Sequence, residues 1–422
     1  AIGRVPVMLN FTSGAMNMKA ALEAAGVKRV LTAHKFIETA KLEDVVEALS
    51  EKAEISYLEE VREKIGLGDK LGAVVKAAFP SSFRARAHHD DAAVILFTSG
   101  SFGAPRGAVL SHQNLVANVE QINAHIEFEP DWVFFNPLPM FHCYGLTGGT
   151  LLPLLSGRKA FLYPSPLHVR DIPKLIAECG ANVLLATDTF AAQYARSAGK
   201  GELSSLKFCV LGAERVKPET RELFRKKFGE VDLLEGYGAT EASPVIAVNS
   251  PIANQHGSVG QILPGIEWKL EEVPGISEGQ KLIVRGANVM KGYLNPNIPG
   301  GIDPLPDGWH DTGDVVNVDA DRFVTIRGRV KRFAKVGGEM VSLNAVEGIA
   351  AQIWPEHHHA AVSVPCARKG EQVVLISDNP NAELTQLIHW AQEKGAPEIA
   401  LPKKIIKIGE IPVLGTGKTD YQ

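Results

Sequence analysis

Cysteine pairs are lacking from this sequence. Its four cysteines, Cys143, Cys179, Cys209 and Cys366, lie far apart and form no C-x-x-C pair. A structural zinc site or a disulfide framework requires paired or clustered cysteines. The sequence therefore argues against both kinds of site. A reducing compartment fits this cysteine usage, so we expect a cytoplasmic protein.

Long hydrophobic runs and an excess of one charge are lacking as well. The longest apolar runs, such as residues 92–97, are far shorter than the roughly 20 residues of a membrane-spanning helix. Lys and Arg number 44 against 48 Asp and Glu, a formal net charge of −4. Such a chain has no general attraction to nucleic acid, although a local basic stretch can still bind an anionic surface. We therefore expect no nucleic-acid partner.

What is present is an alternation of strand and helix patterns. One helix is expected to begin at Ser111, an N-cap residue, and another after Pro218, which suits a first helical turn. Alternation of this kind is typical of a mostly parallel sheet covered by helices on both faces. The β-rich runs that suggest it lie at residues 93–97, 183–186, 208–211 and 231–234.

The chain has 422 residues and exceeds one ordinary domain, so more than one hydrophobic core is expected. After about residue 256 the pattern changes to strands and turns, with a hairpin expected around residues 319–321. We predict an α/β protein in three parts. These are a large N-terminal domain of helix-covered, mostly parallel sheets (1–255), a β-rich subdomain (256–328) and a small, mobile α+β C-terminal domain (329–422) with a hinge at 329–332.

A loop rich in glycine and hydroxyl groups follows the run at residues 93–97. Its glycines let backbone N–H groups point inward and Arg106 supplies a positive charge, so the loop could wrap phosphates. It is not a Walker A loop, because no Gly-Lys-Ser/Thr precedes a helix. An ordinary surface loop is the alternative. The candidate residues are Thr98, Ser99, Gly100, Ser101, Gly103, Arg106 and Gly107.

Two further motifs combine polar groups that a nucleotide needs. Residues 235–241 offer the Tyr237 ring, the Thr240 hydroxyl and the Glu241 carboxylate, which could hold a base, a phosphate and a magnesium ion. A glycine turn with a packed tyrosine is the alternative. Downstream, residues 307–314 place acidic groups on an expected tight turn before a strand, where Asp314 could accept hydrogen bonds from ribose hydroxyls. A solvated turn is the alternative.

These three motifs, in this order and at these separations, resemble the adenylate-forming superfamily of acyl-CoA synthetases, luciferases and peptide-synthetase adenylation domains. Signatures at residues 326–332 and 414–418 agree, so the resemblance covers essentially the whole chain. Residues 331–343, 288–294 and 161–166 look like one branch. That branch is the acyl-ACP synthetase region (ACP, acyl carrier protein) of the bacterial bifunctional 2-acylglycerophosphoethanolamine acyltransferases.

The resemblance implies two half-reactions, with ATP and Mg²⁺ as cofactors. A long-chain fatty acid attacks the α-phosphate of ATP to give acyl-AMP, and the phosphopantetheine thiol of ACP then displaces AMP. Coenzyme A in place of ACP is the alternative. The branch also implies a lysophospholipid acyltransferase partner, absent from this chain, that uses the acyl group at the cytoplasmic face of the bacterial inner membrane.

The resemblance assigns nucleotide contacts by motif position. Residues 98–107 would cradle the departing phosphates, with Glu241 holding magnesium beside Thr240. Tyr237 would stack on adenine, positioning being the main contribution to this chemistry. The remaining contacts to adenine and ribose would come from Gly212, Ala213, Glu214, Gly236, Gly238, Asp314 and Arg329.

The resemblance also assigns roles outside the nucleotide site. His142 would line the entrance for the carboxylate substrate. Lys418, on a Gly-Thr-Gly loop, would serve adenylation, and Lys335 would serve thioester formation. A rotation about Lys331 would exchange these two lysines between the half-reactions.

The chain departs from the family's phosphate loop at two positions. Phe102 stands where threonine, serine or glutamate is usual, and Arg106 stands where lysine is usual. Arginine keeps the charge but changes its geometry. Adenylation could therefore be slow or lost, and a noncatalytic nucleotide- or acyl-binding remnant is the alternative from another class. The family normally has more sequence ahead of a segment like residues 5–10, so we expect a fragment of a longer protein.

Overall fold

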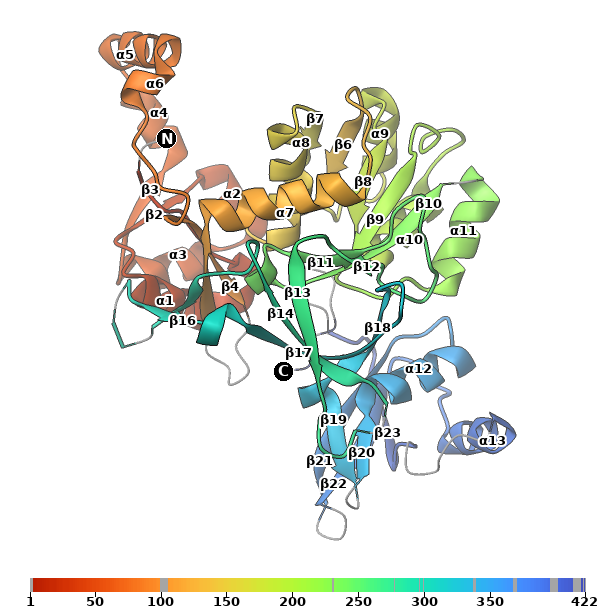
Figure 1. Cartoon of the computed structure of the whole chain (residues 1–422). Coiled ribbons are helices and arrows are strands. Elements are labelled where there is room, and N and C mark those ends of the chain that lie inside the picture. The colour runs from red at the N-terminus through yellow and green to blue at the C-terminus, as the bar shows by residue number, and fades with distance from the viewer. Residues whose placement is uncertain are drawn as a thin grey trace.

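The computed structural model shows a mixed α/β chain, as the sequence predicts (Figure 1). It describes residues 3–98, 105–229, 231–276, 278–295, 297–298, 300–336, 339–366, 370–394, 401–412, 419 and 421. Within these residues, no helix has both the length and the apolar character that crossing a membrane needs.

A seven-stranded sheet forms the centre of the large body in Figure 1. Its order is β12-β11-β10-β9-β8-β6-β7, and the strands from β10 to β7 pair in parallel. Three of them agree with predicted β-rich runs. The strands are β6 (Val133–Asn136), β7 (Lys159–Leu162), β8 (Val183–Ala186), β9 (Phe208–Gly212), β10 (Asp232–Gly238), β11 (Val245–Val248) and β12 (Gln261–Ile262).

Helices cover both faces of this sheet, because successive side chains of a strand point to opposite faces. Val183 of β8 packs in one core with Val119 of α7. Its neighbour Leu184 packs in another core with Ile172 of α9. The predicted cap Ser111 accepts a hydrogen bond from the Asn114 backbone N–H. The helices are α7 (His112–His125), η2 (Tyr144–Leu151), α8 (Leu152–Leu155), α9 (Ile172–Cys179), α10 (Asp188–Ser197) and α11 (Pro218–Phe228).

A five-stranded sheet with the order β1-β4-β5-β15-β16 carries the candidate phosphate loop. Only β1 and β4 pair in parallel here, because β5 returns directly beside β4 as a hairpin. Thr98 pairs with Arg106 at the end of the hairpin where the candidate loop joins the two strands. The strands are β1 (Val7–Met8), β4 (Ala92–Thr98), β5 (Arg106–Ser111), β15 (Gly292–Leu294) and β16 (Ile302–Pro304).

Two further sheets follow along the chain. The antiparallel sheet β13-β14-β17-β18 includes the predicted hairpin, in which Val318 pairs with Val324. Its strands are β13 (Ile266–Glu271), β14 (Gln280–Gly286), β17 (His310–Val318) and β18 (Val324–Arg329), with η4 (Pro306–Gly308) before β17. The last sheet has its own core around Val346 and Leu375. Its elements are η5 (Val330–Arg332), β19 (Phe333–Val336), β20 (Glu339–Ser342), α12 (Leu343–Ile353), β21 (His359–Cys366), β22 (Gly370–Ser377), α13 (Leu384–Lys394) and β23 (Lys404–Lys407).

Residues 11–83 form small helices around a two-stranded sheet, on the side of the molecule that is red in Figure 1. Helices α5 and α6 lie at its outer tip. The elements are η1 (Phe11–Ser13), α1 (Gly14–Ala25), β2 (Arg29–Thr32), α2 (His34–Ala40), α3 (Glu43–Ser50), β3 (Glu54–Tyr57), α4 (Leu58–Glu63), α5 (Leu67–Ala78) and α6 (Pro80–Phe83). The domain boundaries and the hinge stay predictions; residues 330–332 form the short η5 that links β18 to β19.

Candidate active site

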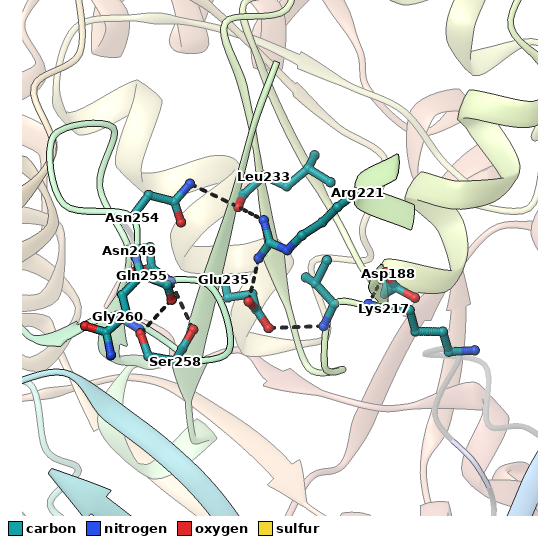
Figure 2. A network of polar contacts seen from close by, with 11 residues as sticks. Asp188, Lys217, Arg221, Leu233, Glu235, Asn249, Asn254, Gln255, Ser258 and Gly260 are labelled. Carbon is teal, nitrogen blue, oxygen red and sulfur yellow. Dashed lines mark hydrogen bonds and ion pairs between the residues drawn. The ribbon is translucent and has the colours of Figure 1, made fainter. Parts of the chain in front are cut away.

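The candidate site begins at the carboxyl end of β10, which a buried polar network holds in place (Figure 2). Glu235 is buried, with 3% of the residue exposed. It accepts hydrogen bonds from Arg221 Nη2 at 2.5 Å and from the Val216 backbone N–H at 3.2 Å. Arg221 also donates to the Leu233 carbonyl at 3.0 Å. Because a buried charge is costly without a partner, this network fixes β10 against the loop that leaves β9.

That loop contains the predicted adenine wall. Ala213 adopts a φ of 71°, a left-handed conformation that turns the chain sharply after β9. Glu214 accepts hydrogen bonds from the backbone N–H of Thr189 at 3.0 Å and from its hydroxyl at 2.8 Å. Burial raises the pKa of Glu214 above its usual value. A Cβ on Gly212 would lie 3.2 Å from the Tyr144 ring, so this edge of the site leaves little space for a side chain.

Tyr237, Asp314 and Arg329 form one chain of polar contacts. The Tyr237 hydroxyl donates to Asp314 Oδ2 at 2.6 Å, and Arg329 Nε donates to Asp314 Oδ1 at 2.7 Å. Burial and the Asp314 charge raise the pKa of Tyr237 well above its ordinary value. The phenol therefore stays protonated and remains a donor. Asp314 lies inside β17 rather than on the turn before a strand, because the turn is confined to η4.

Glu241, Tyr293 and Arg106 form a second chain. The Tyr293 hydroxyl donates to Glu241 Oε1 at 2.6 Å, and the Arg106 guanidinium lies 3.5 Å from the centre of the Tyr293 ring. Burial and the Glu241 charge raise the pKa of Tyr293. Glu241 belongs to a short helix, η3 (Thr240–Ala242). Its backbone carbonyl accepts a hydrogen bond from the Met290 backbone N–H at 2.8 Å, which holds η3 against the segment just before β15.

Thr240 and the histidine motif form a third contact. Cys143 Sγ lies 3.3 Å from the Thr240 hydroxyl, and His142 Nδ1 accepts from the Tyr144 backbone N–H at 3.3 Å. Cys143 is buried. Cys143, which contacts Thr240, directly follows His142 in the sequence. The predicted entrance residue His142 therefore lies next to a residue of this contact. At Gly238, a Cβ would meet the Pro244 carbonyl oxygen at 2.2 Å, so this position has no space for a side chain.

The structure describes part of the predicted phosphate loop. Thr98 ends β4 and its hydroxyl lies 3.5 Å from the Arg106 carbonyl. Arg106 and Gly107, which were expected in the loop, are the first residues of β5, because hairpin pairing extends to Arg106. The other candidates in this loop, Ser99, Gly100, Ser101 and Gly103, lie outside the described residues, as does Phe102.

Of the three predicted lysines, the structure describes Lys331 and Lys335. Lys335 is exposed on β19, and its backbone N–H donates to the Glu371 carboxylate. Lys331 lies in η5, at the start of the last part of the chain. Lys418 lies outside the described residues. The catalytic roles of these lysines, like those of the nucleotide contacts, stay predictions.

Two further residues of this site, Tyr293 and His310, are not among those predicted from the sequence. Tyr293 was read only as part of a motif, although it joins Arg106 to Glu241. His310 is buried on β17, and the charges of Glu241, Asp314 and Arg106 all act on it. Burial lowers the pKa of His310. The available signals were an aromatic residue after Lys-Gly and a histidine among acidic residues. Neither signal indicates which residue the side chain contacts.

Comparisons with known proteins agree with this arrangement of motifs. The profile of the AMP-binding enzyme family matches residues 1–294. A long-chain-fatty-acid–CoA ligase of Salmonella typhimurium is 32% identical over 347 residues, which cover 78% of this chain and 60% of that protein. A medium-chain fatty-acid–CoA ligase of Escherichia coli is 28% identical over 348 residues, with the same two coverages. The chain thus spans about 60% of the length of these curated relatives.

Solved structures give the same result for the fold. ATP-bound MatB from Rhodopseudomonas palustris superposes with a TM-score of 0.80 at 25% identity, over 99% of this chain and 82% of that one. For the O-succinylbenzoate coenzyme A synthetase of Bacillus subtilis, in complex with ATP and magnesium, the TM-score is 0.81 at 20% identity, over 98% and 82%. Because the family profile matches more than half of the sequence, this chain belongs to the AMP-binding enzyme family.

Proposed function

We propose that this chain activates a long-chain fatty acid with ATP and Mg²⁺ to give acyl-AMP, and passes the acyl group to the phosphopantetheine thiol of ACP. The observation that carries the proposal is the convergence of three contact chains on residues 236–241. They link Tyr237 to Asp314 and Arg329, Glu241 to Tyr293 and Arg106, and Thr240 to Cys143.

The donors and acceptors of these residues suit a nucleotide. Asp314 already accepts from Tyr237 and Arg329, and each carboxylate oxygen can accept a second hydrogen bond, which a ribose hydroxyl would supply. The Tyr237 ring and the segment Gly212 to Glu214 would flank the adenine. Arg106 would oppose the phosphate charge, since a guanidinium is a strong partner for phosphate. The roles of Thr98 and the neighbouring loop residues follow from their motif.

The oxygen donors at residues 240–241 also suit a magnesium ion. Mg²⁺ prefers carboxylate and hydroxyl oxygens, and it is usually bound by one or two carboxylates together with substrate phosphates. Tyr293 engages Oε1 of Glu241, and this hydrogen bond sets the orientation of the whole carboxylate. Glu241 would hold the ion, with Thr240 beside it. The ion would supply charge neutralisation at the departing pyrophosphate.

The acyl substrate is proposed from two supports. The relatives are described as long-chain and medium-chain fatty-acid–CoA ligases. The segments at 161–166 and 288–294 match the acyl-ACP synthetase branch. His142 would face the carboxylate, and Lys418 would bridge it to the α-phosphate as the new bond forms, a contact most valuable in the transition state.

Two thiols are candidates for receiving the acyl group, that of ACP and that of coenzyme A. The branch match at residues 331–343 favours ACP, and the names of the relatives favour coenzyme A. With ACP as the acceptor, the product would serve lysophospholipid reacylation by an acyltransferase at the cytoplasmic face of a bacterial inner membrane. Lys335 would then act in thioester formation after rotation about Lys331.

Exchange of labelled pyrophosphate into ATP tests the first half-reaction. We expect Mg²⁺-dependent exchange with palmitate and oleate and none with an amino acid. Equal exchange with palmitate and an amino acid would contradict the fatty-acid assignment. Absence of exchange with every acid, together with ATP binding, would indicate the noncatalytic remnant instead.

Supplied acyl-AMP tests the second half-reaction separately. Transfer to holo-ACP at least tenfold faster than to coenzyme A would support the proposed acceptor, and the reverse ratio would replace it. Lys418→Ala should lose pyrophosphate exchange and keep thioester formation, whereas Lys335→Ala should show the opposite defect. Loss of the same half-reaction in both variants would contradict the rotation.

A further inference from the structure

Helices α5 and α6 form a tip that projects from the red side of the molecule (Figure 1). None of the residues of either helix is buried. By contrast α9, a shorter helix of the large body, buries Ile172, Pro173 and Ile176. An amphipathic helix ordinarily gains its stability by burying its apolar face, so the exposed face of α5 requires an explanation.

The apolar residues of α5 lie along one stripe. Leu67, Leu71, Val74 and Val75 follow one another at steps of four, three and one residues, which places them on one side of a helix. These four side chains are between 50% and 80% exposed. The exposed Phe79 and Phe83 extend the apolar surface into α6. Contiguous apolar surface of this kind marks an interaction site.

The charge around the stripe is opposite to that of the whole chain. Residues 64–86 contain five cationic side chains and one carboxylate, a net charge of +4 in a chain whose net charge is −4. The carboxylate, Asp69, accepts a hydrogen bond from the Gly66 backbone N–H at 3.0 Å. The cationic residues are Lys64, Lys70, Lys76, Arg84 and Arg86, all exposed.

We propose that α5 and α6 dock the chain on the surface of an anionic phospholipid bilayer. An apolar stripe flanked by lysine and arginine is the pattern by which a helix lies in the interface between headgroups and acyl chains. Basic residues near a negative membrane surface add attraction that falls off within a Debye length. Because α5 has 12 residues, it would lie on the bilayer and not span it. The proposal is independent of the proposed catalytic activity.

The charge of the tip favours an anionic bilayer as its partner. An anionic surface would repel the acidic remainder of the chain and attract the tip, which fixes one orientation on the membrane. A second copy of the chain would bring two cationic tips together, an arrangement that like charges disfavour.

Flotation of the whole chain with lipid vesicles tests the proposal. With vesicles of phosphatidylcholine and phosphatidylglycerol at low salt, we expect at least tenfold more bound protein than with phosphatidylcholine alone. The bound fraction should fall as salt is added. Leu71→Glu should reduce binding at least tenfold, and Lys70→Glu with Lys76→Glu should abolish the preference for anionic vesicles. Circular dichroism shows whether each variant is folded.

Leu167→Glu is the matched control, because Leu167 is 69% exposed and Leu71 is 67% exposed. Its binding should equal that of the unmodified chain. The proposal is overturned if the unmodified chain fails to float, or if Leu71→Glu and Leu167→Glu float equally well. A dimer in sedimentation analysis that Leu71→Glu dissociates, without vesicle binding, would assign the tip to a second copy instead.

Discussion

The side chains of residues 236–241 and those of the tip at residues 64–86 differ in their surroundings. The side chains of the first segment bond to Asp314 of β17, Tyr293 of β15 and Cys143, at distances of 2.6–3.3 Å. The second segment presents leucine, valine and phenylalanine to solvent. The difference indicates that the polar side chains of the first segment find their hydrogen-bond partners within the chain. The apolar side chains of the tip are exposed, and in our proposal a lipid bilayer covers them.

The two regions should therefore differ in how well they tolerate polar substitutions. A polar substitution in the site leaves a donor or acceptor unpaired, which costs stability, function or both. A polar substitution on the tip replaces an apolar group that water already surrounds, and such changes are usually small. Substitutions in both places therefore measure how different the two regions are.

The largest expected effect is at the candidate metal ligand. Glu241→Gln keeps the shape of the side chain and removes the charge that would hold Mg²⁺. We expect the rate of pyrophosphate exchange to fall by about 100-fold or more, the range seen when transition-state electrostatics are lost.

The control for this change is Glu120→Gln, on the exposed side of α7. It should leave the exchange rate within about twofold of the unmodified chain, as is usual for an exposed position. A reduction of less than threefold in Glu241→Gln would remove Glu241 from the metal site.

The second effect compares stability in the two regions directly. Asp314→Asn turns one oxygen that accepts from Tyr237 or Arg329 into an amino group. Arg329 is 61% exposed, so its ion pair contributes little, and the buried Tyr237 contact decides the outcome. We expect a loss of about 1–3 kcal/mol in the free energy of unfolding. Leu71→Glu should change it by no more than about 0.5 kcal/mol.

Urea unfolding at pH 7.5 measures both variants. A larger loss for Leu71→Glu than for Asp314→Asn would mean that α5 is packed in solution, and the contrast between the two regions would fail.

The third effect is at Tyr293. Tyr293→Phe keeps the ring beneath Arg106 and removes the hydroxyl that donates to Glu241 Oε1. Loss of one charge-assisted hydrogen bond would lower kcat about five- to twentyfold, with a smaller change in KM for ATP. Tyr163→Phe is the control, because that hydroxyl bonds only a surface histidine, His168, among the described contacts. Equal effects of the two changes would deny Tyr293 a positioning role.

Motifs of a few adjacent residues allowed much of the site to be predicted. Tyr237, Thr240 and Glu241 are predicted together because they offer an aromatic face, a hydroxyl and a carboxylate within a few residues, groups that could hold a nucleotide and a magnesium ion. The strand at Val183–Ala186 was predicted because a short continuous apolar run suits a buried parallel strand.

Contacts between distant segments could not be predicted in the same way. Tyr293 meets Glu241 only because β15 pairs with β5, and no local pattern gives that pairing. The hairpin that places Arg106 in β5 likewise depends on strand pairing across the loop. On α5 the spacing of the apolar residues gives the stripe, but whether that stripe is exposed depends on which other elements pack against it.

The smallest effect concerns the pH dependence of stability, and it compares buried His310 with exposed His88, which follows the tip. Burial lowers the pKa of His310 below its ordinary value of 6.5, although nearby carboxylates oppose this shift. The unfolded chain therefore takes up a proton near pH 6.5 that the folded chain resists, so this contribution to stability is lost as the pH falls below 6.5. Between pH 7.5 and 5.5, His310→Gln should lose less stability than the unmodified chain, by about 1 kcal/mol or less. His88→Gln is the control at an exposed position and should match the unmodified chain, since changes at exposed positions usually have small effects on stability. Urea unfolding at both pH values decides the matter, and equal losses in all three proteins would show that His310 becomes protonated as readily in the folded chain as in the unfolded one.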